Sequence, residues 1–102
     1  MNFNNVNVAL AGNSYFDGAV TSRTLTFTDG SRKTLGYMQI GDYTFGTEAA
    51  ELMEITAGDI EYKLADTEEW LAVKSGESFN VPANSKFDIK VKTVTDYCCS
   101  YL

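Results

Sequence analysis

The residues best suited to chemistry in this sequence are its arginines and carboxylates, because the 102-residue chain contains no histidine. The absence of histidine excludes the Ser-His-Asp triad, the Cys-His dyad and every histidine-based metal site. Arg23 and Arg32 carry guanidinium groups, whose planar set of N–H donors pairs with carboxylates and other oxyanions.

Arg23 lies in an alternating run whose orientation the sequence leaves open. It shares one side of the run with Ala19, Leu25 and Phe27, while the opposite side is rich in threonine. If the apolar side faces the core, the guanidinium is buried and requires a carboxylate or a bound anion. If the threonine-rich side faces the core, Arg23 lies outside it.

The chain around these residues has the pattern of a β protein. Short runs alternate with period two, as in residues 60–64 and 87–92, and turn signals such as Asp29-Gly30 and Ser75-Gly76 separate them. No window combines a helical period with capping residues. We therefore expect an all-β fold in a single domain, with residues 1–12 as a loose lead-in that could form a strand and residues 13–102 as the folded body.

Charge and cysteine content limit the partners. The net charge is −6 and no lysine or arginine cluster is present, so nucleic acid is not an expected partner. The sequence contains no long apolar run of the kind that would indicate a membrane segment. Cys98 and Cys99 are adjacent, so they are poorly placed to pair with each other and are expected to be reduced thiols of a cytoplasmic protein.

Two spaced segments resemble the conserved motifs of the cupin superfamily. Gly76, Pro82 and Asn84 follow the second cupin motif, with Asn84 replacing a glycine and Phe87 standing at the position of the metal-binding histidine. Asparagine is one of the few residues that tolerate the left-handed backbone of such a turn. The sequence thus resembles a cupin that lacks a metal ligand.

The first cupin motif shows the same loss of ligands. Its glutamate and final glycine match Glu51 and Gly58, but Phe45 and Thr47 stand at its two histidine positions. A single carboxylate among phenylalanines cannot form a four-coordinate site for Zn, Fe or Mn. The resemblance therefore implies a cupin-type β-barrel, or jelly roll, with no metal and no other cofactor.

From about Asn13 to Leu102 the chain resembles the small pyrimidine/purine nucleoside phosphorylase family. The segments that carry this resemblance are YFDGAV, GDYTFGT, ESFNVPANSKFDIKV and the C-terminal TDYCCSYL. It implies a cytoplasmic homodimer and phosphorolysis of several purine and pyrimidine nucleosides to a free base and ribose 1-phosphate. The enzyme would thus be a pentosyltransferase whose partners are nucleoside and inorganic phosphate.

The expected site combines the residue chemistry with this resemblance. Arg23 is expected to hold phosphate, and Glu51 to face the ribose as positive charge develops on it. The residues expected to bind substrate are Arg32, Tyr43, Phe45, Thr47, Phe87 and Tyr97.

Alternatives remain for this site and its activity. Glu51 could instead pair with an interior arginine, and the aromatic side chains could be core residues. A non-catalytic, metal-free cupin that binds a small sugar or nucleotide is the alternative function.

Overall fold

The computed structural model describes residues 2–102, and its regular elements are β-strands apart from one 3-10 turn, η1 (Phe16–Gly18). The prediction of an all-β chain is therefore confirmed. The strands are β1 (Asn7–Val8), β2 (Asn13–Tyr15), β3 (Val20–Thr26), β4 (Arg32–Met38), β5 (Gly41–Gly46), β6 (Glu51–Ala57), β7 (Asp59–Leu64), β8 (Leu71–Lys74), β9 (Ser78–Val81), β10 (Lys86–Val91) and β11 (Thr95–Tyr101).

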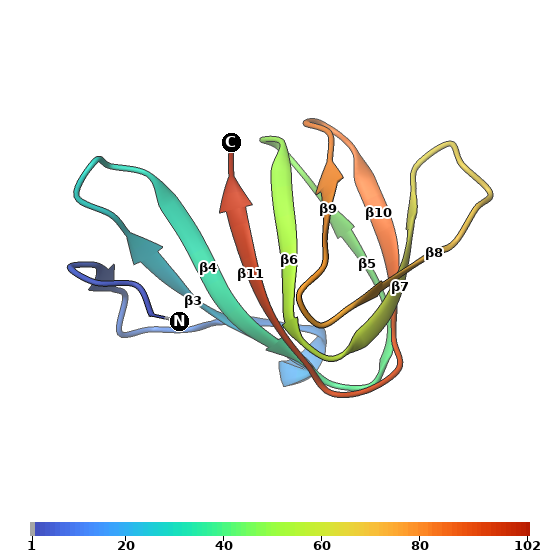
Figure 1. The fold of residues 1–102 in the computed structure, drawn as a ribbon, viewed down its shortest axis with the longest axis horizontal. Coiled ribbons are helices and arrows are strands. Elements are labelled where there is room, and N and C mark those ends of the chain that lie inside the picture. Colours follow the sequence, from blue (N-terminus) through green and yellow to red (C-terminus); the bar gives the residue numbers. More distant parts are fainter. Residues whose placement is uncertain (1) are drawn as a thin grey trace.

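The strands form two antiparallel sheets (Figure 1). The larger sheet has the order β1-β3-β4-β11-β6-β9, with β2 also paired to β3, and the smaller sheet has the order β5-β10-β7-β8. Between residues 2 and 102 no strand pairing joins one sheet to the other, so the predicted closure into a barrel is not confirmed. In Figure 1, β3 and β4 extend past the small sheet, which leaves part of their inner face without a facing strand.

The core lies between the two sheets. Because side chains alternate along a strand, every second residue of each sheet points into one cluster of buried side chains. The cluster includes Ile55 and Tyr97 of the large sheet and Ile60 and Ile89 of the small sheet. Across it, the rings of Tyr62 and Phe79 stack with centroids 3.9 Å apart. These contacts fix the separation of the sheets and hence the width of any opening between them.

The turn before β10 has the backbone that its sequence predicts. Asn84 adopts a positive φ of 53°, the left-handed conformation for which asparagine was expected to replace glycine. Its N–H donates to the carbonyl of Glu48 at 3.1 Å, which joins the turn to the segment preceding β6.

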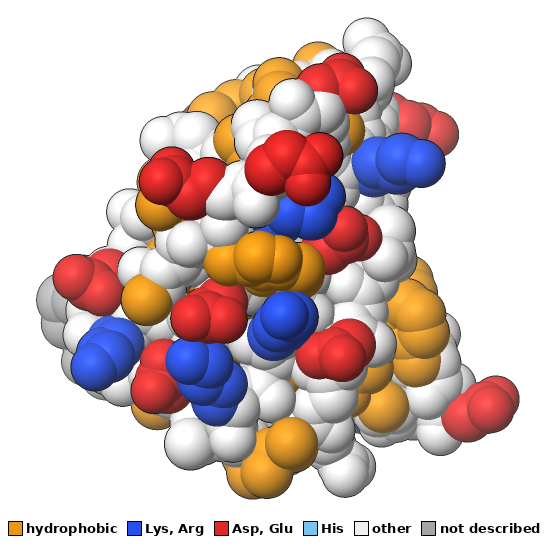
Figure 2. All heavy atoms as spheres, turned by 90° about the vertical axis from the view of Figure 1, so that its right-hand side faces the viewer, with side chains coloured by type: hydrophobic (Ala, Val, Ile, Leu, Met, Phe, Trp, Pro, Cys, Tyr) orange, Lys and Arg blue, Asp and Glu red, His pale blue; other side chains and the backbone are white. Residues whose placement is uncertain are grey.

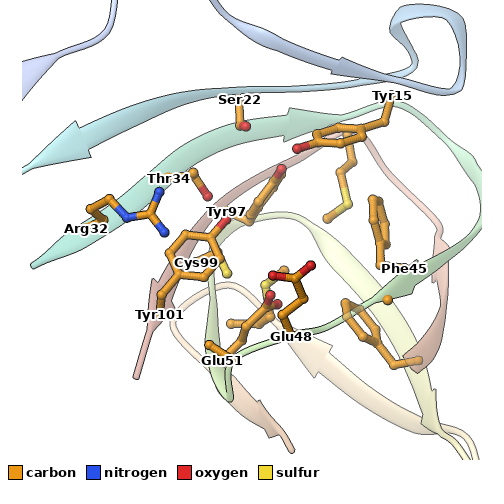
Figure 3. Close-up of a pocket in the computed structure, with 15 residues that line it drawn as sticks. Tyr15, Ser22, Arg32, Thr34, Phe45, Glu48, Glu51, Tyr97, Cys99 and Tyr101 are labelled. Carbon is orange, nitrogen blue, oxygen red and sulfur yellow. The ribbon is translucent and has the colours of Figure 1, made fainter. Parts of the chain in front are cut away.

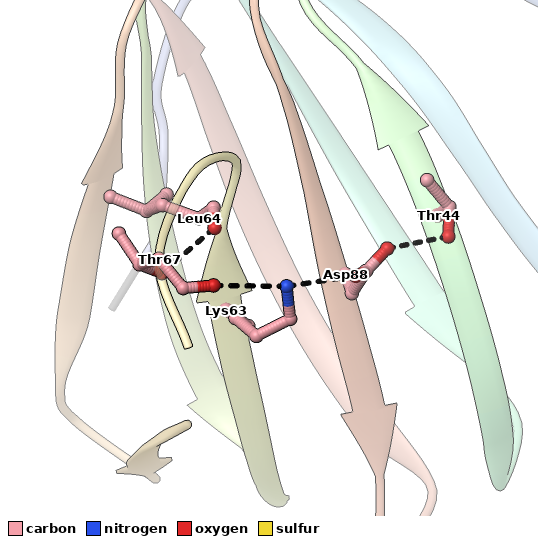
Figure 4. A network of polar contacts seen from close by, with 5 residues as sticks. All are labelled: Thr44, Lys63, Leu64, Thr67 and Asp88. Carbon is pink, nitrogen blue, oxygen red and sulfur yellow. Dashed lines mark hydrogen bonds and ion pairs between the residues drawn. The ribbon is translucent and has the colours of Figure 1, made fainter. Parts of the chain in front are cut away.

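The outer face of the small sheet carries polar side chains. Asp88 accepts a hydrogen bond from Thr44 at 2.6 Å and lies 3.7 Å from the Lys63 ammonium, which also donates to the Thr67 carbonyl (Figure 4). Exposed pairs of this kind contribute little to stability. Acidic and basic side chains are interspersed over the face on the side of β7, β8 and β10 (Figure 2), so this face lacks the continuous basic area that nucleic acids require.

No helix of residues 2–102 has the length and apolar character needed to cross a membrane.

Candidate active site

A pocket of about 460 Å³ opens between the sheets where β3 and β4 extend past the small sheet (Figure 3). Its walls come from both sheets and from the segment before β6. The strands bring side chains to it that are far apart in the sequence, from Tyr15 to Tyr101. Arg32 lies at one end beside Tyr101, Tyr15 and Phe45 lie at the other, and the carboxyl groups of Glu48 and Glu51 lie between them (Figure 3).

The cationic end is formed by Arg32. Its guanidinium carbon lies 5.3 Å from the ring centroid of Tyr101, a cation–π contact that restrains the side chain. The ion pairs found among residues 2–102 join Lys63 to Asp88 and Lys92 to Glu61, and Arg32 takes part in neither. Its charge is therefore available to an anion in the pocket.

The aromatic end is formed by Phe45, Phe87 and Tyr15. Phe45 and Phe87 are paired residues of β5 and β10, and their rings stack with centroids 5.7 Å apart. Tyr15 approaches the edge of Phe45 from β2 at 6.1 Å and is 44% exposed. A half-exposed ring beside a stacked pair provides a flat apolar surface for another aromatic group.

Glu51 and Glu48 place carboxyl groups between the two ends (Figure 3). Glu51 begins β6 and pairs across the sheet with Tyr101, and the Cys99 thiol lines the same pocket. Burial raises the pKa of Glu51, while the nearby Cys99 thiol opposes that rise. The pocket thus disfavours the ionised form of Glu51.

Replacing Glu51 with glutamine is therefore expected to raise the melting temperature of the unliganded protein at pH 7. A carboxyl group whose pKa is raised in the folded state stabilises the fold below its unfolded pKa, and that stability is lost as pH rises through the folded pKa. Glutamine does not ionise, so Glu51→Gln avoids this loss. The advantage should shrink as pH falls to the ordinary glutamate value of 4.5. Thermal melts of both proteins from pH 4 to pH 8 test this, and an advantage that does not change with pH would contradict it.

Tyr97 lies over a glycine on the neighbouring strand. It pairs with Gly36 of β4, and burial raises the pKa of its phenol. A Cβ on Gly36 would overlap the Tyr97 ring and lie 2.5 Å from the Thr21 carbonyl oxygen. The absence of a side chain at Gly36 is what allows the tyrosine to line the pocket.

Gly36→Ala is expected to destabilise the protein by about 1–3 kcal/mol, the usual cost of overpacking a core. The backbone oxygen of Thr21 cannot move aside as a flexible side chain could. Gly46→Ala is the matched control, because the nearest atom to its Cβ, the Ser85 carbonyl oxygen, is 3.9 Å away. Urea unfolding of the two variants measures the difference, and equal midpoints would contradict the prediction.

Five of the eight predicted site residues line this pocket: Arg32, Phe45, Glu51, Phe87 and Tyr97. The structure brings together an arginine, a carboxyl group and three aromatic rings from five different strands.

The other three predicted site residues, Arg23, Tyr43 and Thr47, do not line the pocket. Arg23 is exposed, since the side of β3 with Val20 and Ser22 faces inward, and its guanidinium lies against the backbone at Gly12. Thr47 is buried and donates to the Pro82 carbonyl at 2.7 Å.

Tyr43 supports the site without lining it. Its hydroxyl donates to the Gln39 carbonyl at 2.8 Å, and its ring centroid lies 6.4 Å from that of Phe45. Arg23 and Thr47 therefore make their contacts outside the pocket, while Tyr43 packs beside a ring that lines it.

Sequence reasoning did not select Tyr15, Glu48 or Cys99, all of which line the pocket, whereas Tyr101, considered from the sequence as a ring that could stack a base, does line it. Cys99 shares the inner face of β11 with Tyr97, so the two-residue period from Tyr97 was the signal that could have found it. Tyr15 and Glu48 reach the pocket from a short strand and a loop, where alternation gives no such signal.

Within residues 2–102 no group of three or more histidine, cysteine, aspartate or glutamate residues is placed to hold a metal ion. Phe45 and Phe87, which stand at two of the cupin ligand positions, instead form part of the pocket wall.

Comparisons with known proteins agree on one family. A sequence model described as Pyrimidine/purine nucleoside phosphorylase matches residues 10–101. A curated protein of that name from Sulfurovum sp. (strain NBC37-1) is 72% identical over 100 residues, which are 98% of this chain and 97% of the relative.

Solved structures agree on the fold. A protein of unknown function from Acinetobacter sp. ADP1 is 40% identical, with a TM-score of 0.96 over 99% of this chain and 98% of its own. A cupin superfamily protein from Desulfitobacterium hafniense DCB-2 has a TM-score of 0.68 at 16% identity, over 81% of this chain and 76% of its own. The second likeness, at such low identity, supports a cupin-like fold alone.

Proposed function

The chain belongs to the pyrimidine/purine nucleoside phosphorylase family, and from this membership we propose that it cleaves several purine and pyrimidine nucleosides with phosphate. The products are a free base and ribose 1-phosphate, which makes the enzyme a pentosyltransferase. The observation that carries the proposal is the arrangement of the pocket. Arg32, which forms no ion pair within residues 2–102, lies at one end, and the rings of Tyr15, Phe45 and Phe87 lie at the other.

In this proposal inorganic phosphate binds at the Arg32 end. The guanidinium group donates to two phosphate oxygens, and the Thr34 hydroxyl lines the same part of the pocket. Tyr101 limits the movement of the guanidinium group, so that less side-chain freedom is lost when phosphate binds.

The base binds at the aromatic end, against Tyr15, Phe45 and Phe87. Every purine and pyrimidine has a π-face, so stacking on these rings does not distinguish strongly between bases. An aromatic surface therefore suits a family whose name covers both pyrimidine and purine nucleosides.

The ribose then lies between the two ends, beside Glu48 and Glu51. A phosphate oxygen attacks C1′, the C1′–N bond breaks, and its electron pair leaves with the base. Positive charge develops on the ribose in between, and the Glu48 carboxylate stabilises it, as a carboxylate does in glycoside cleavage. The pocket walls hold the two reactants in near-attack geometry.

The activity is tested by incubating the protein with uridine or adenosine, with and without phosphate, and measuring free base by chromatography. Base released only with phosphate, together with an equal amount of ribose 1-phosphate, is the expected result. Base released without phosphate would indicate hydrolysis. Binding of the nucleoside with no base released in either case would favour the alternative of a non-catalytic binding protein.

We also propose a homodimer that forms through the outer face of the large sheet. Leu35 and Tyr37 of β4 are 41% and 45% exposed there, on the face that also carries Cys98 of β11. An exposed apolar area on a sheet is a common site of association. Sedimentation at micromolar concentration should give about twice the chain mass of 11.2 kDa, and Leu35→Glu should shift the protein to monomer. A monomeric wild-type protein would contradict this.

The proposed location is the cytoplasm. Cys98 and Cys99 are both free thiols, which persist in a reducing compartment.

A further inference from the structure

Glu51, Tyr101 and Arg32 form one row across three adjacent strands of the large sheet. Tyr101 of β11 pairs with Glu51 of β6 on one side. On its other side β11 pairs with β4 up to Ser100 and Lys33, so the next position of that register places Tyr101 beside Arg32. The cation–π distance of 5.3 Å agrees with this placement. The Tyr101 ring thus separates the carboxyl group from the guanidinium group.

The charges that line the pocket do not suit a dianion while both carboxyl groups are ionised. The charged side chains in its lining are Arg32, Glu48 and Glu51, one cation against two carboxylates. Arg32 forms no ion pair with Glu51, although both flank the same ring. A phosphate held by Arg32 would therefore face an unneutralised carboxylate across Tyr101, and that repulsion opposes binding.

We propose that Glu51 and Arg32 together form the phosphate subsite. Glu51 is protonated when phosphate binds and donates a hydrogen bond to a phosphate oxygen on the side opposite Arg32. Phosphate and one proton then enter the pocket together. This inference rests on the proposed function for the identity of the anion, but the anion subsite can be tested without a nucleoside.

The surroundings of Glu51 favour the neutral acid. On β11, Tyr101 and Cys99 face it, and of these the Cys99 thiol favours the ionised form. Glu48 lies in the segment before β6 and has the same sign of charge. Val81, its partner on β9, is apolar, and Arg32 on β4 lies over the Tyr101 ring. Burial dominates and raises that pKa.

Sulfate distinguishes the proton on Glu51 from the proton of phosphate itself. Phosphate changes its own protonation near neutral pH, whereas sulfate stays a dianion from pH 5 to pH 8. Calorimetric titration with sodium sulfate at constant ionic strength therefore reports protonation of the protein alone. For the wild type we expect the affinity to fall as pH rises, approaching tenfold per pH unit, with uptake of up to one proton per sulfate.

Glu51→Gln should bind sulfate with an affinity that changes less than about twofold over this pH range, because its amide donates without a titrating proton. Glu54→Gln is the matched control: Glu54 lies on the same strand but on the outer face, where it pairs with Cys98, and this variant should keep the wild-type slope. A melting curve of each variant verifies that it is folded.

Three results would overturn the inference. They are pH-independent sulfate binding by the wild type, a slope that survives in Glu51→Gln, and no sulfate binding by any of the three proteins. If the slope survives in Glu51→Gln and is lost in Glu48→Gln, the proton is carried by Glu48 instead. If sulfate binds with the expected slope but no base is ever released, phosphorolysis fails while the paired uptake of anion and proton stands.

Discussion

Arg32→Ala is expected to raise the KM for phosphate about 10- to 150-fold while leaving the KM for nucleoside nearly unchanged. The substitution removes a charge-assisted contact worth about 1.5–3 kcal/mol. Among residues 2–102, Arg32 is the only lysine or arginine that lines the pocket, so none of the others can take over its contact. Initial rates at varied phosphate and saturating uridine measure the effect.

Arg23→Ala is the comparison that tests the location of the phosphate subsite. Sequence reasoning expected Arg23 to hold phosphate, whereas the side chain is exposed on the outer side of β3 beside Gly12. With the subsite at Arg32, Arg23→Ala should change the KM for phosphate by less than about twofold. A large rise in KM for Arg23→Ala and none for Arg32→Ala would move the subsite to the outer face and would contradict the proposed site.

The orientation of β3 shows why an apolar pattern alone did not decide which side is inner. Leu25 is only 3% exposed, as a core residue would be, but it lies on the outer side, where it pairs with Val8 of β1. Phe27 packs on the same side against Phe3, with ring centroids 5.2 Å apart. The N-terminal segment therefore buries apolar residues outside the main core, and this long-range contact has no local signal in the sequence.

The inner side of β3 has polar residues because part of it lines the pocket. Ser22 is buried, and Asn13 donates to its hydroxyl at 3.1 Å. Buried hydroxyl groups are stable when they have such partners. A strand that borders a polar pocket thus departs from the apolar alternation by which the inner side of a strand is usually predicted.

Motif spacing predicted more of the site than alternation did. It identified Glu51 and Phe87, both of which line the pocket, and the left-handed turn at Asn84. The same spacing placed Thr47 in the site, but the Thr47 hydroxyl bonds to the Pro82 carbonyl and accepts the Ser85 N–H at 3.0 Å. Spacing therefore locates a position in the fold, but the local hydrogen bonds decide where a short side chain points.

Tyr15 is the residue through which the base-binding end can be tested with least risk to the fold. It is 44% exposed, so its ring contributes less to the core than the buried Phe87. It precedes two residues with left-handed backbone, Phe16 at φ 53° and Asp17 at φ 54°. Such conformations persist where the surroundings hold them, here through the contact of Phe16 with Tyr43 at 5.0 Å. The turn thus fixes the position of Tyr15 over the pocket.

Tyr15→Ala is expected to raise the KM for uridine and for adenosine about 5- to 150-fold, because base–aromatic stacking is worth about 1–3 kcal/mol per base. The KM for phosphate should stay within about twofold, since Arg32 lies at the opposite end of the pocket (Figure 3). Tyr15→Phe keeps the ring and should remain close to the wild type for both nucleosides.

Phe3→Ala is the matched control, because Phe3 is a similarly exposed ring, at 42%, that packs on Phe27 outside the pocket. It should leave both nucleoside KM values near those of the wild type. Equal losses in Tyr15→Phe and Tyr15→Ala would assign the effect to the hydroxyl group instead of the ring. A loss confined to the KM for phosphate would place the anion at the aromatic end and reverse the proposed direction of the nucleoside in the pocket.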